Sequence, residues 1–207
     1  MRLDKLLPPT RPGGPWTLVL EGGGTLRVPE QVTAEFSLCG GMDLTPEEWE
    51  RLTQAAQLQK LRESAVRLLT GRSMSTGMLR DKLTARGASP DQAEDIAAWA
   101  ESLGLLNDRE YARQVVRTGQ RRGWGRYKIQ DALYRRQVPR DCWEEALDTL
   151  SDPSEAIDTF LASRLRDPED PKQVQRAAAA LARRGFSWDV VSEGIDRAKT
   201  AWRDNQR

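Results

Sequence analysis

The chain has 207 residues, of which 38% are hydrophobic and 30% are charged, and its formal net charge is +1. This composition is typical of a helix-rich protein with modest cores, and the near-zero net charge excludes a uniformly polycationic protein. Histidine is absent and only two dispersed cysteines are present. These absences exclude imidazole-based catalysis, imidazole metal ligands and a thiolate zinc site, so much enzyme chemistry is excluded and we expect no metal or cofactor. Dispersed cysteines and the lack of a long apolar run predict a cytoplasmic protein.

The first part of the chain carries β-strand signals. Residues 1–15 are rich in proline and glycine, and we expect a mobile arm there. Residues 16–21 and 25–28 are β-prone and are joined by three glycines, which predicts a hairpin. No Gly-Lys-Ser/Thr follows these glycines, so a plain turn is favoured over a phosphate-binding loop. Residues 32–38 form either a third short strand or a helical turn.

A helix start follows at Thr45. Thr45 suits the N-cap, Pro46 the first helical position, and Glu48 completes a capping box. We therefore expect a small extension over residues 1–57, with a β-hairpin and a short helix.

From residue 58 the apolar spacing is helical and repeats. One register of apolar residues ending in Arg-Gly, or in Arg-Gln in the second copy, occurs three times: Leu79, Leu83, Arg86 and Gly87; Ile129, Leu133, Arg136 and Gln137; Ala177, Leu181, Arg184 and Gly185. Such a period predicts tandem three-helix repeats over 58–106, 107–151 and 152–207, forming an elongated, curved, mainly α body. Tryptophans of the predicted third helices are interpreted as packing residues: Trp99, Trp143, Trp188 and Trp202.

The second repeat contains an unusually basic segment. Residues 109–140 hold ten arginines and lysines against only Glu110 and Asp131. Within it, four arginines recur every four residues and form one ridge, opposite the apolar stripe of Tyr111, Ala112, Val115 and Val116: Arg109, Arg113, Arg117 and Arg121. The ridge lacks interleaved acids, so we prefer an anion-binding role over a merely solvated helix face. Guanidinium suits both carboxylate and phosphate, so the ridge alone does not identify its partner.

Trp124 lies between two glycines and two arginines. It either stacks on an unpaired base or packs at a helix start, and we favour packing. The candidate residues for binding an anionic partner such as a nucleic acid are Arg109, Arg113, Arg117, Arg121, Arg122, Trp124, Arg126, Lys128 and Arg135.

These segments resemble a known family. The segments Gly104-Leu105-Leu106-Asn107-Asp108, Tyr111-Ala112, Arg121-Arg122-Gly123-Trp124-Gly125 and Lys128-Ile129 are similar to the central signature of the RecX family. Residues 65–69, 79–83 and 86–87 are similar to the family's opening repeat. The chain departs from that pattern at Gln137, where the other repeats have glycine, and at Trp124.

The resemblance implies a bent, nearly all-helical monomer that binds the RecA–single-stranded DNA filament. It further implies that the protein is not an enzyme, and that it restrains filament growth, ATP hydrolysis, strand exchange and co-protease activity, in recombinational repair and the SOS response. The single strand would be contacted directly or through RecA, and no membrane is involved. Two alternatives stay open: a helix-turn-helix transcription regulator, which would use basic second helices as recognition helices, and a helical scaffold that binds only protein.

Overall fold

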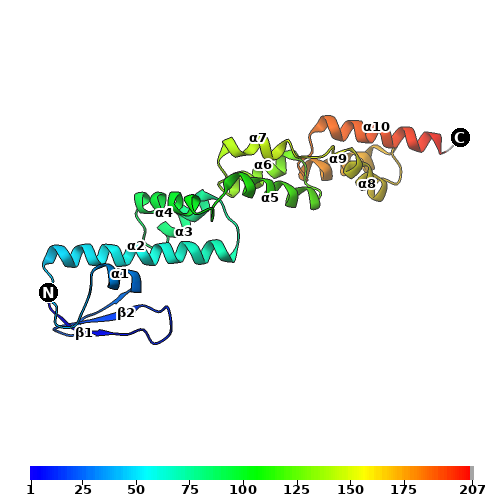
Figure 1. The fold of residues 1–207 in the computed structure, drawn as a ribbon. Helices are drawn as coiled ribbons and strands as arrows, with labels where there is room; N and C mark the ends of the chain where they lie inside the picture. Colours follow the sequence, from blue (N-terminus) through cyan, green and yellow to red (C-terminus); the bar gives the residue numbers. More distant parts are fainter. Residues whose placement is uncertain (206–207) are drawn as a thin grey trace. The chain divides into compact units, whose positions relative to one another are not determined.

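A computed structural model describes residues 1–205 (Figure 1). By backbone contacts the chain forms two compact units. The first comprises Met1–Arg72 and Leu79–Leu105, and the second comprises Ser73–Met78 and the chain from Leu106 onward. Helices dominate both units, with one small sheet near the N-terminus.

The sheet of the first unit has three antiparallel strands in the order β1-β2-β3: β1 (Leu3–Leu7), β2 (Trp16–Leu20) and β3 (Thr25–Val28). The predicted hairpin is β2–β3, and Gly22 and Gly23 adopt the positive φ that its turn requires. The prediction of a mobile arm over residues 1–15 is wrong for β1. Leu3 is fully buried and pairs with Leu20, so the apolar residues of this short segment hold it in the sheet.

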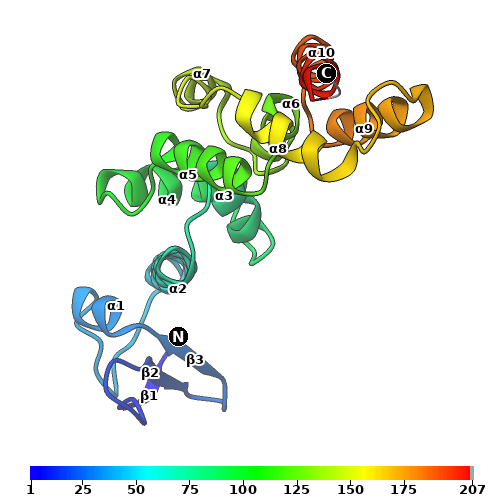
Figure 2. The same ribbon diagram turned by 90° about the vertical axis from the view of Figure 1, so that its right-hand side faces the viewer.

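The helices α1 (Glu30–Glu35) and α2 (Pro46–Gly71) cover this sheet, and α2 is seen end-on in Figure 2. Of the two readings of residues 32–38, the helical one is correct. The capping box is confirmed: the Glu48 backbone N–H donates to Thr45 Oγ1 at 3.1 Å, and the Thr45 N–H donates to the Glu48 carboxylate at 2.8 Å. The latter bond lowers the pKa of Glu48 below its ordinary value. The expected short helix is instead a continuous helix of 26 residues, because no proline or glycine interrupts it before Gly71.

Two further helices complete the first unit: α3 (Thr76–Thr84), from Leu79 onward, and α4 (Pro90–Ser102). Leu79 and Leu83 of α3 are fully buried. A second capping box starts α4, where the Gln92 N–H donates to Ser89 Oγ at 3.1 Å and the Ser89 N–H donates to the Gln92 side chain at 3.0 Å. Helix α4 packs on α2.

The second unit contains two successive three-helix bundles. The elements of the first bundle are α5 (Asp108–Arg121), α6 (Arg126–Arg135), the 3₁₀ turn η1 (Arg140–Cys142) and α7 (Trp143–Leu147). Those of the second are α8 (Ser154–Arg164), α9 (Pro171–Arg183) and α10 (Trp188–Asp204). Each bundle has its own apolar core, one centred on Val116, Ile129 and Leu133 and the other on Ile157, Leu161 and Leu181. The prediction of a mainly α protein with tandem three-helix repeats and a small β extension is therefore confirmed.

The repeated second helices all end in the same kind of backbone turn. Gly87 and Gly185 have φ of 91° and 89°, in the left-handed region that glycine adopts without strain. At the equivalent place in the central bundle, Gln137 adopts φ of 51° despite its Cβ. The backbone turn is thus the same in all three repeats, although the residue differs.

The interpretation of the third-helix tryptophans as packing residues holds for Trp143, which packs against the core of the central bundle. It is wrong for Trp188, whose exposed fraction is 69%. Trp188 is the first residue of α10, and Val191 and Ile195 fill the core position on that helix instead.

Candidate functional site

Helix α5 carries the predicted arginine ridge on a well-defined scaffold. The Asn107 side chain accepts a hydrogen bond from the Glu110 N–H at 2.9 Å and so caps the helix start. Ala112 and Val116 are fully buried against α6 and α7. The predicted apolar stripe is therefore confirmed, and the arginines occupy the solvent-facing side of the same helix.

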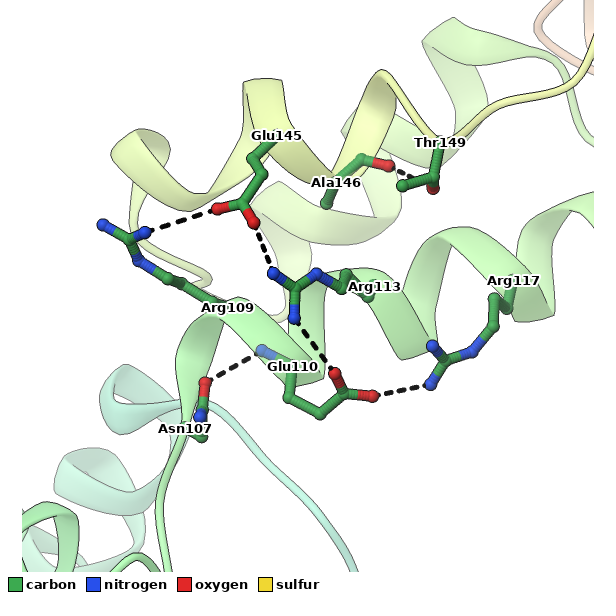
Figure 3. Close-up of polar contacts among 8 residues, drawn as sticks. All are labelled: Asn107, Arg109, Glu110, Arg113, Arg117, Glu145, Ala146 and Thr149. Carbon is green, nitrogen blue, oxygen red and sulfur yellow. Dashed lines mark hydrogen bonds and ion pairs between the residues drawn. The ribbon is translucent and has the colours of Figure 1, made fainter.

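Carboxylates of the same bundle bind three of these arginines (Figure 3). Glu145, on α7, pairs with Arg109 at 3.4 Å and also with Arg113. Glu110, on α5 itself, pairs with Arg113 at 3.3 Å and with Arg117 at 2.8 Å. We call Arg109, Arg113 and Arg117 the paired arginines. Three cations share two carboxylates, so this group retains a small excess of positive charge.

The expectation of a ridge without interleaved acids is thus wrong. Glu110 lies one turn before Arg113 and two turns before Arg117, within reach of both. Glu145 comes from another helix, and no window along α5 contains it. The pairing shifts the pKa values of both partners. Hydrogen bonds from Arg117 and Arg113 lower the pKa of Glu110, and hydrogen bonds to Glu145 and Glu110 raise the pKa of Arg113.

A second group of cations lies at the turn between α5 and α6. We call it the turn cluster; its members are Arg121, Arg122, Arg126 and Lys128. None of the four forms an ion pair with any residue in 1–205. Arg121, Arg122 and Arg126 are exposed. The turn cluster therefore presents positive charge that the described part of the chain does not neutralise.

Trp124 lies within this turn and is half-buried. Its ring packs against the core of the central bundle. The Arg122 guanidinium carbon and the Lys128 Nζ lie 5.3 and 5.2 Å from the ring centroid, which is a cation–π distance. The ring is engaged from both the core and the solvent side, so the geometry favours packing over base stacking. Its effect is to hold two members of the turn cluster in place.

Arg135, near the end of α6, differs from the turn cluster. Its guanidinium pairs with Asp131 one turn earlier at 3.0 Å, although its side chain is largely exposed. It is a member of a surface pair of the i, i+4 type, and its charge is largely compensated.

The start of α6 is fixed by the last bundle. Gly125 N–H donates to the Arg184 carbonyl at 2.8 Å, and Tyr127 N–H donates to the Gly185 carbonyl at 3.1 Å. A Cβ on Gly125 would overlap the Gly185 carbonyl, so glycine is required for this approach. These carbonyls occupy two of the N-terminal amides of α6, those of Gly125 and Tyr127, which are therefore closed to phosphate.

An equivalent contact joins Ser73–Met78 to the other end of α6. The Ser75 hydroxyl donates to the Arg136 carbonyl, and the Thr76 N–H donates to Asp108 Oδ1 at 2.9 Å. Ser75 and Arg136 occupy the same repeat positions as Gly125 and Arg184. One repeated contact thus holds both ends of α6, which carries part of the candidate surface.

The sequence reasoning missed two exposed aromatic residues on α6. Tyr127 and Tyr134 have exposed fractions of 62% and 66%. Both lie opposite the buried stripe of Ile129, Ala132 and Leu133. The signal was available, because two tyrosines seven residues apart on an amphipathic helix share its polar face.

Other kinds of site find no support in residues 1–205. No group of three or more carboxylates or cysteines there is arranged to hold a metal ion, and no described helix is long and apolar enough to cross a membrane. Cys142 is buried, and its burial raises the pKa of its thiol, which makes it a packing residue rather than a nucleophile.

Comparisons with known proteins decide the family. A model of the second three-helix domain of RecX matches residues 107–147, and a model of the third matches residues 161–195. A regulatory protein RecX from Deinococcus radiodurans is 34% identical over 151 residues, which cover 69% of this chain and 70% of that protein. One from Thermus thermophilus is 37% identical over 141 residues, covering 67% and 87% respectively. The chain belongs to the RecX family.

Solved structures support the same fold for this RecX-family protein. A crystal structure of regulatory protein RecX superposes with a TM-score of 0.74 at 21% identity, covering 94% of this chain and 98% of that one. RecX from Lactobacillus salivarius superposes with a TM-score of 0.64 at 22% identity, covering 70% and 99%. The curated relatives of this RecX-family chain are named regulatory proteins, and none of the names given above describes a catalysed reaction.

Proposed function

We propose that this RecX-family protein is a non-enzymatic regulator that binds the RecA–single-stranded DNA filament. It restrains filament growth, ATP hydrolysis, strand exchange and co-protease activity, in recombinational repair and the SOS response. It acts in the cytoplasm as a monomer. The family membership and the regulatory role named for its relatives support this function.

The turn cluster is the observation that carries the proposal. A nucleoprotein filament presents phosphates and acidic side chains, and its surface attracts cations that are not already neutralised. Four such cations gather within eight residues, next to a tryptophan that holds two of them. Arginine offers a planar donor fork that suits both phosphate and carboxylate.

The paired arginines contribute less in this proposal. An incoming anion must replace Glu110 or Glu145 to bind them, so part of the gain is lost in breaking the existing pair. Arg135 is subject to the same competition from Asp131. The predicted binding residues therefore divide into a turn cluster of high availability and a paired set of low availability.

The direct test is the DNA-dependent ATPase of RecA on single-stranded DNA. We expect inhibition at substoichiometric amounts of this protein. Arg121→Glu with Arg126→Glu should weaken inhibition strongly. Arg11→Glu with Arg51→Glu, at two exposed arginines of the first unit, makes the same change in charge and is the matched control, which should not weaken it. No effect on ATPase, together with sequence-specific binding to duplex DNA, would contradict the proposal and favour the helix-turn-helix alternative.

A further inference from the structure

The exposed side of α6 carries two tyrosines in line. Tyr127 and Tyr134 are seven residues apart, so they lie on nearly the same face of the helix, about 10.5 Å apart along its axis at 1.5 Å per residue. Both rings are mostly in solvent, with exposed fractions of 62% and 66%. Two exposed rings in line on one helix face give this face an aromatic character, which makes it a candidate binding surface.

Each tyrosine borders a concave surface. Tyr127 lines a groove of about 520 Å³ together with Trp124, Arg126 and Phe186. Tyr134 lines two shallow hollows of about 340 and 500 Å³. Both hollows also include Arg140 and Trp143. Each concavity combines an exposed phenol ring with an arginine that has no ion-pair partner in the described chain.

The charges along this face favour an anionic chain. The turn cluster lies at the Tyr127 end, and Arg140 lies at the Tyr134 end. Asp131, between the two tyrosines, is paired with Arg135 and adds little repulsion. Asp148 and Asp152 also line the groove beside Tyr127, and their carboxylates repel a phosphate chain that would enter the groove.

The start of α6 has fewer backbone amides to offer an anion than an open helix start has. The N–H groups of Gly125 and Tyr127 donate to the carbonyls of Arg184 and Gly185, as described above. We therefore assign the phosphates to the cationic side chains and the bases to the aromatic rings.

We propose that Tyr127 and Tyr134 stack on unpaired bases of a single-stranded nucleic acid, while the turn cluster binds its phosphates. This inference rests on the proposed function and assigns a direct DNA contact to the same surface. Stacking platforms flanked by cations bind single strands because unpaired bases expose their faces, whereas the bases of a duplex are stacked on each other. The proposal also explains why aromatic and basic residues alternate at the start of α6, in Arg126-Tyr127-Lys128.

The test uses the full chain without RecA. Fluorescence anisotropy compares the binding of a labelled oligo(dT) with that of an abasic oligonucleotide carrying the same number of phosphates. The wild-type protein should prefer the oligonucleotide with bases by about tenfold or more, since each stacked base contributes a measurable part of the affinity. Tyr127→Ala with Tyr134→Ala should remove this preference, and Tyr127→Phe with Tyr134→Phe should keep it.

Two controls separate the contribution of base stacking from that of phosphate binding. Trp188→Ala removes an equally exposed aromatic residue outside the central bundle and should leave the preference unchanged. Arg121→Gln with Arg126→Gln should weaken binding to both oligonucleotides equally. Circular dichroism and thermal unfolding verify that each variant is folded.

Three results of the oligonucleotide titrations would overturn the inference. They are equal affinity of the wild-type protein for both oligonucleotides, an undiminished preference in the Tyr→Ala variant, and no measurable binding to oligo(dT) at low salt. Loss of filament inhibition in the Tyr→Ala variant with its base preference intact would assign the tyrosines to a protein contact and overturn it as well. Inhibition of RecA ATPase by a wild-type protein without base preference would leave the proposed function standing.

Discussion

The paired arginines and the turn cluster lie in one bundle and differ mainly in their neighbours. Arg109, Arg113 and Arg117 lie where α7 and the first turn of α5 bring carboxylates within reach. The turn cluster begins where α5 ends, beyond the reach of those acids. Equal density of positive charge along the sequence therefore does not mean equal availability to a partner. What determines availability is the number of cations that have no carboxylate partner in the folded bundle.

The largest effect should come from removing the turn cluster. We expect Arg121→Gln with Arg126→Gln to weaken binding to oligo(dT) by at least about tenfold, because two charge-assisted phosphate contacts are lost. The slope of log K against log salt should also become shallower, by about 0.7 for each contact removed. Titrations at several salt concentrations measure both. An unchanged slope would show that these arginines do not touch phosphate.

A second effect, on stability and not on binding, should follow from disturbing the turn that holds α6. Gly185 combines φ of 89° with a Cβ position that would overlap the Lys128 amide. Gly185→Ala should lower the free energy of unfolding by about 2–4 kcal/mol, as expected for backbone strain added to a steric clash. Gly87→Ala is the matched control, because Gly87 has φ of 91° and open space around it. Equal destabilisation of the two variants in thermal unfolding would contradict the role of the contact.

Releasing the paired arginines should have a moderate effect of opposite sign. Glu145→Gln frees Arg109 and Arg113 from their partner on α7, so affinity for oligo(dT) should rise by roughly two- to fivefold and the salt slope should steepen. Asp158→Asn, which frees Arg197 in the last bundle, serves as the control and should have no effect on this affinity. Weaker binding by Glu145→Gln would mean that the carboxylate positions the arginines for binding.

The smallest effect should be that of pH. The chain has no histidine, and hydrogen bonds from Arg117 and Arg113 hold the pKa of Glu110 below its ordinary value of 4.5. The stabilising pairs with Glu110 are present above the ordinary pKa and are lost only as the pH falls through the lowered one. Affinity for oligo(dT) should therefore be flat between about pH 7.5 and 5.5. A several-fold rise within this interval would show that a different group controls the surface.

The sequence predicted those parts of the fold that depend on local pattern. The capping box at Thr45, the hairpin glycines and the register ending at Gly87 and Gly185 are all visible within short windows. Strand β1 was missed because five residues with no strong period join the sheet through Leu3, which is buried by partners distant in sequence. The full length of α2 was missed because the predicted boundary between the N-terminal extension and the first repeat, at residues 57 and 58, lies inside this helix.

In the candidate site, too, the features that depend on local spacing were predicted and those that depend on distant residues were not. The side of α5 that carries arginine followed from spacing, as did the packing of Trp124 at the helix start. The neutralisation by Glu145 did not, since it depends on how α7 returns to α5 and joins residues 32 and 36 positions apart. Tyr127 and Tyr134 could have been recognised from their spacing, but attention to charge left them out.

The central claim is that the turn cluster, and not the set of paired arginines, meets the filament. Inhibition of RecA ATPase measured with Arg121→Gln and Arg126→Gln, against Arg109→Gln and Arg113→Gln, tests it most directly, because each variant removes two positive charges from the same bundle. We expect the half-inhibitory concentration to rise at least about tenfold for the first pair and less than about threefold for the second. The opposite order, with the paired arginines more important, would contradict the account.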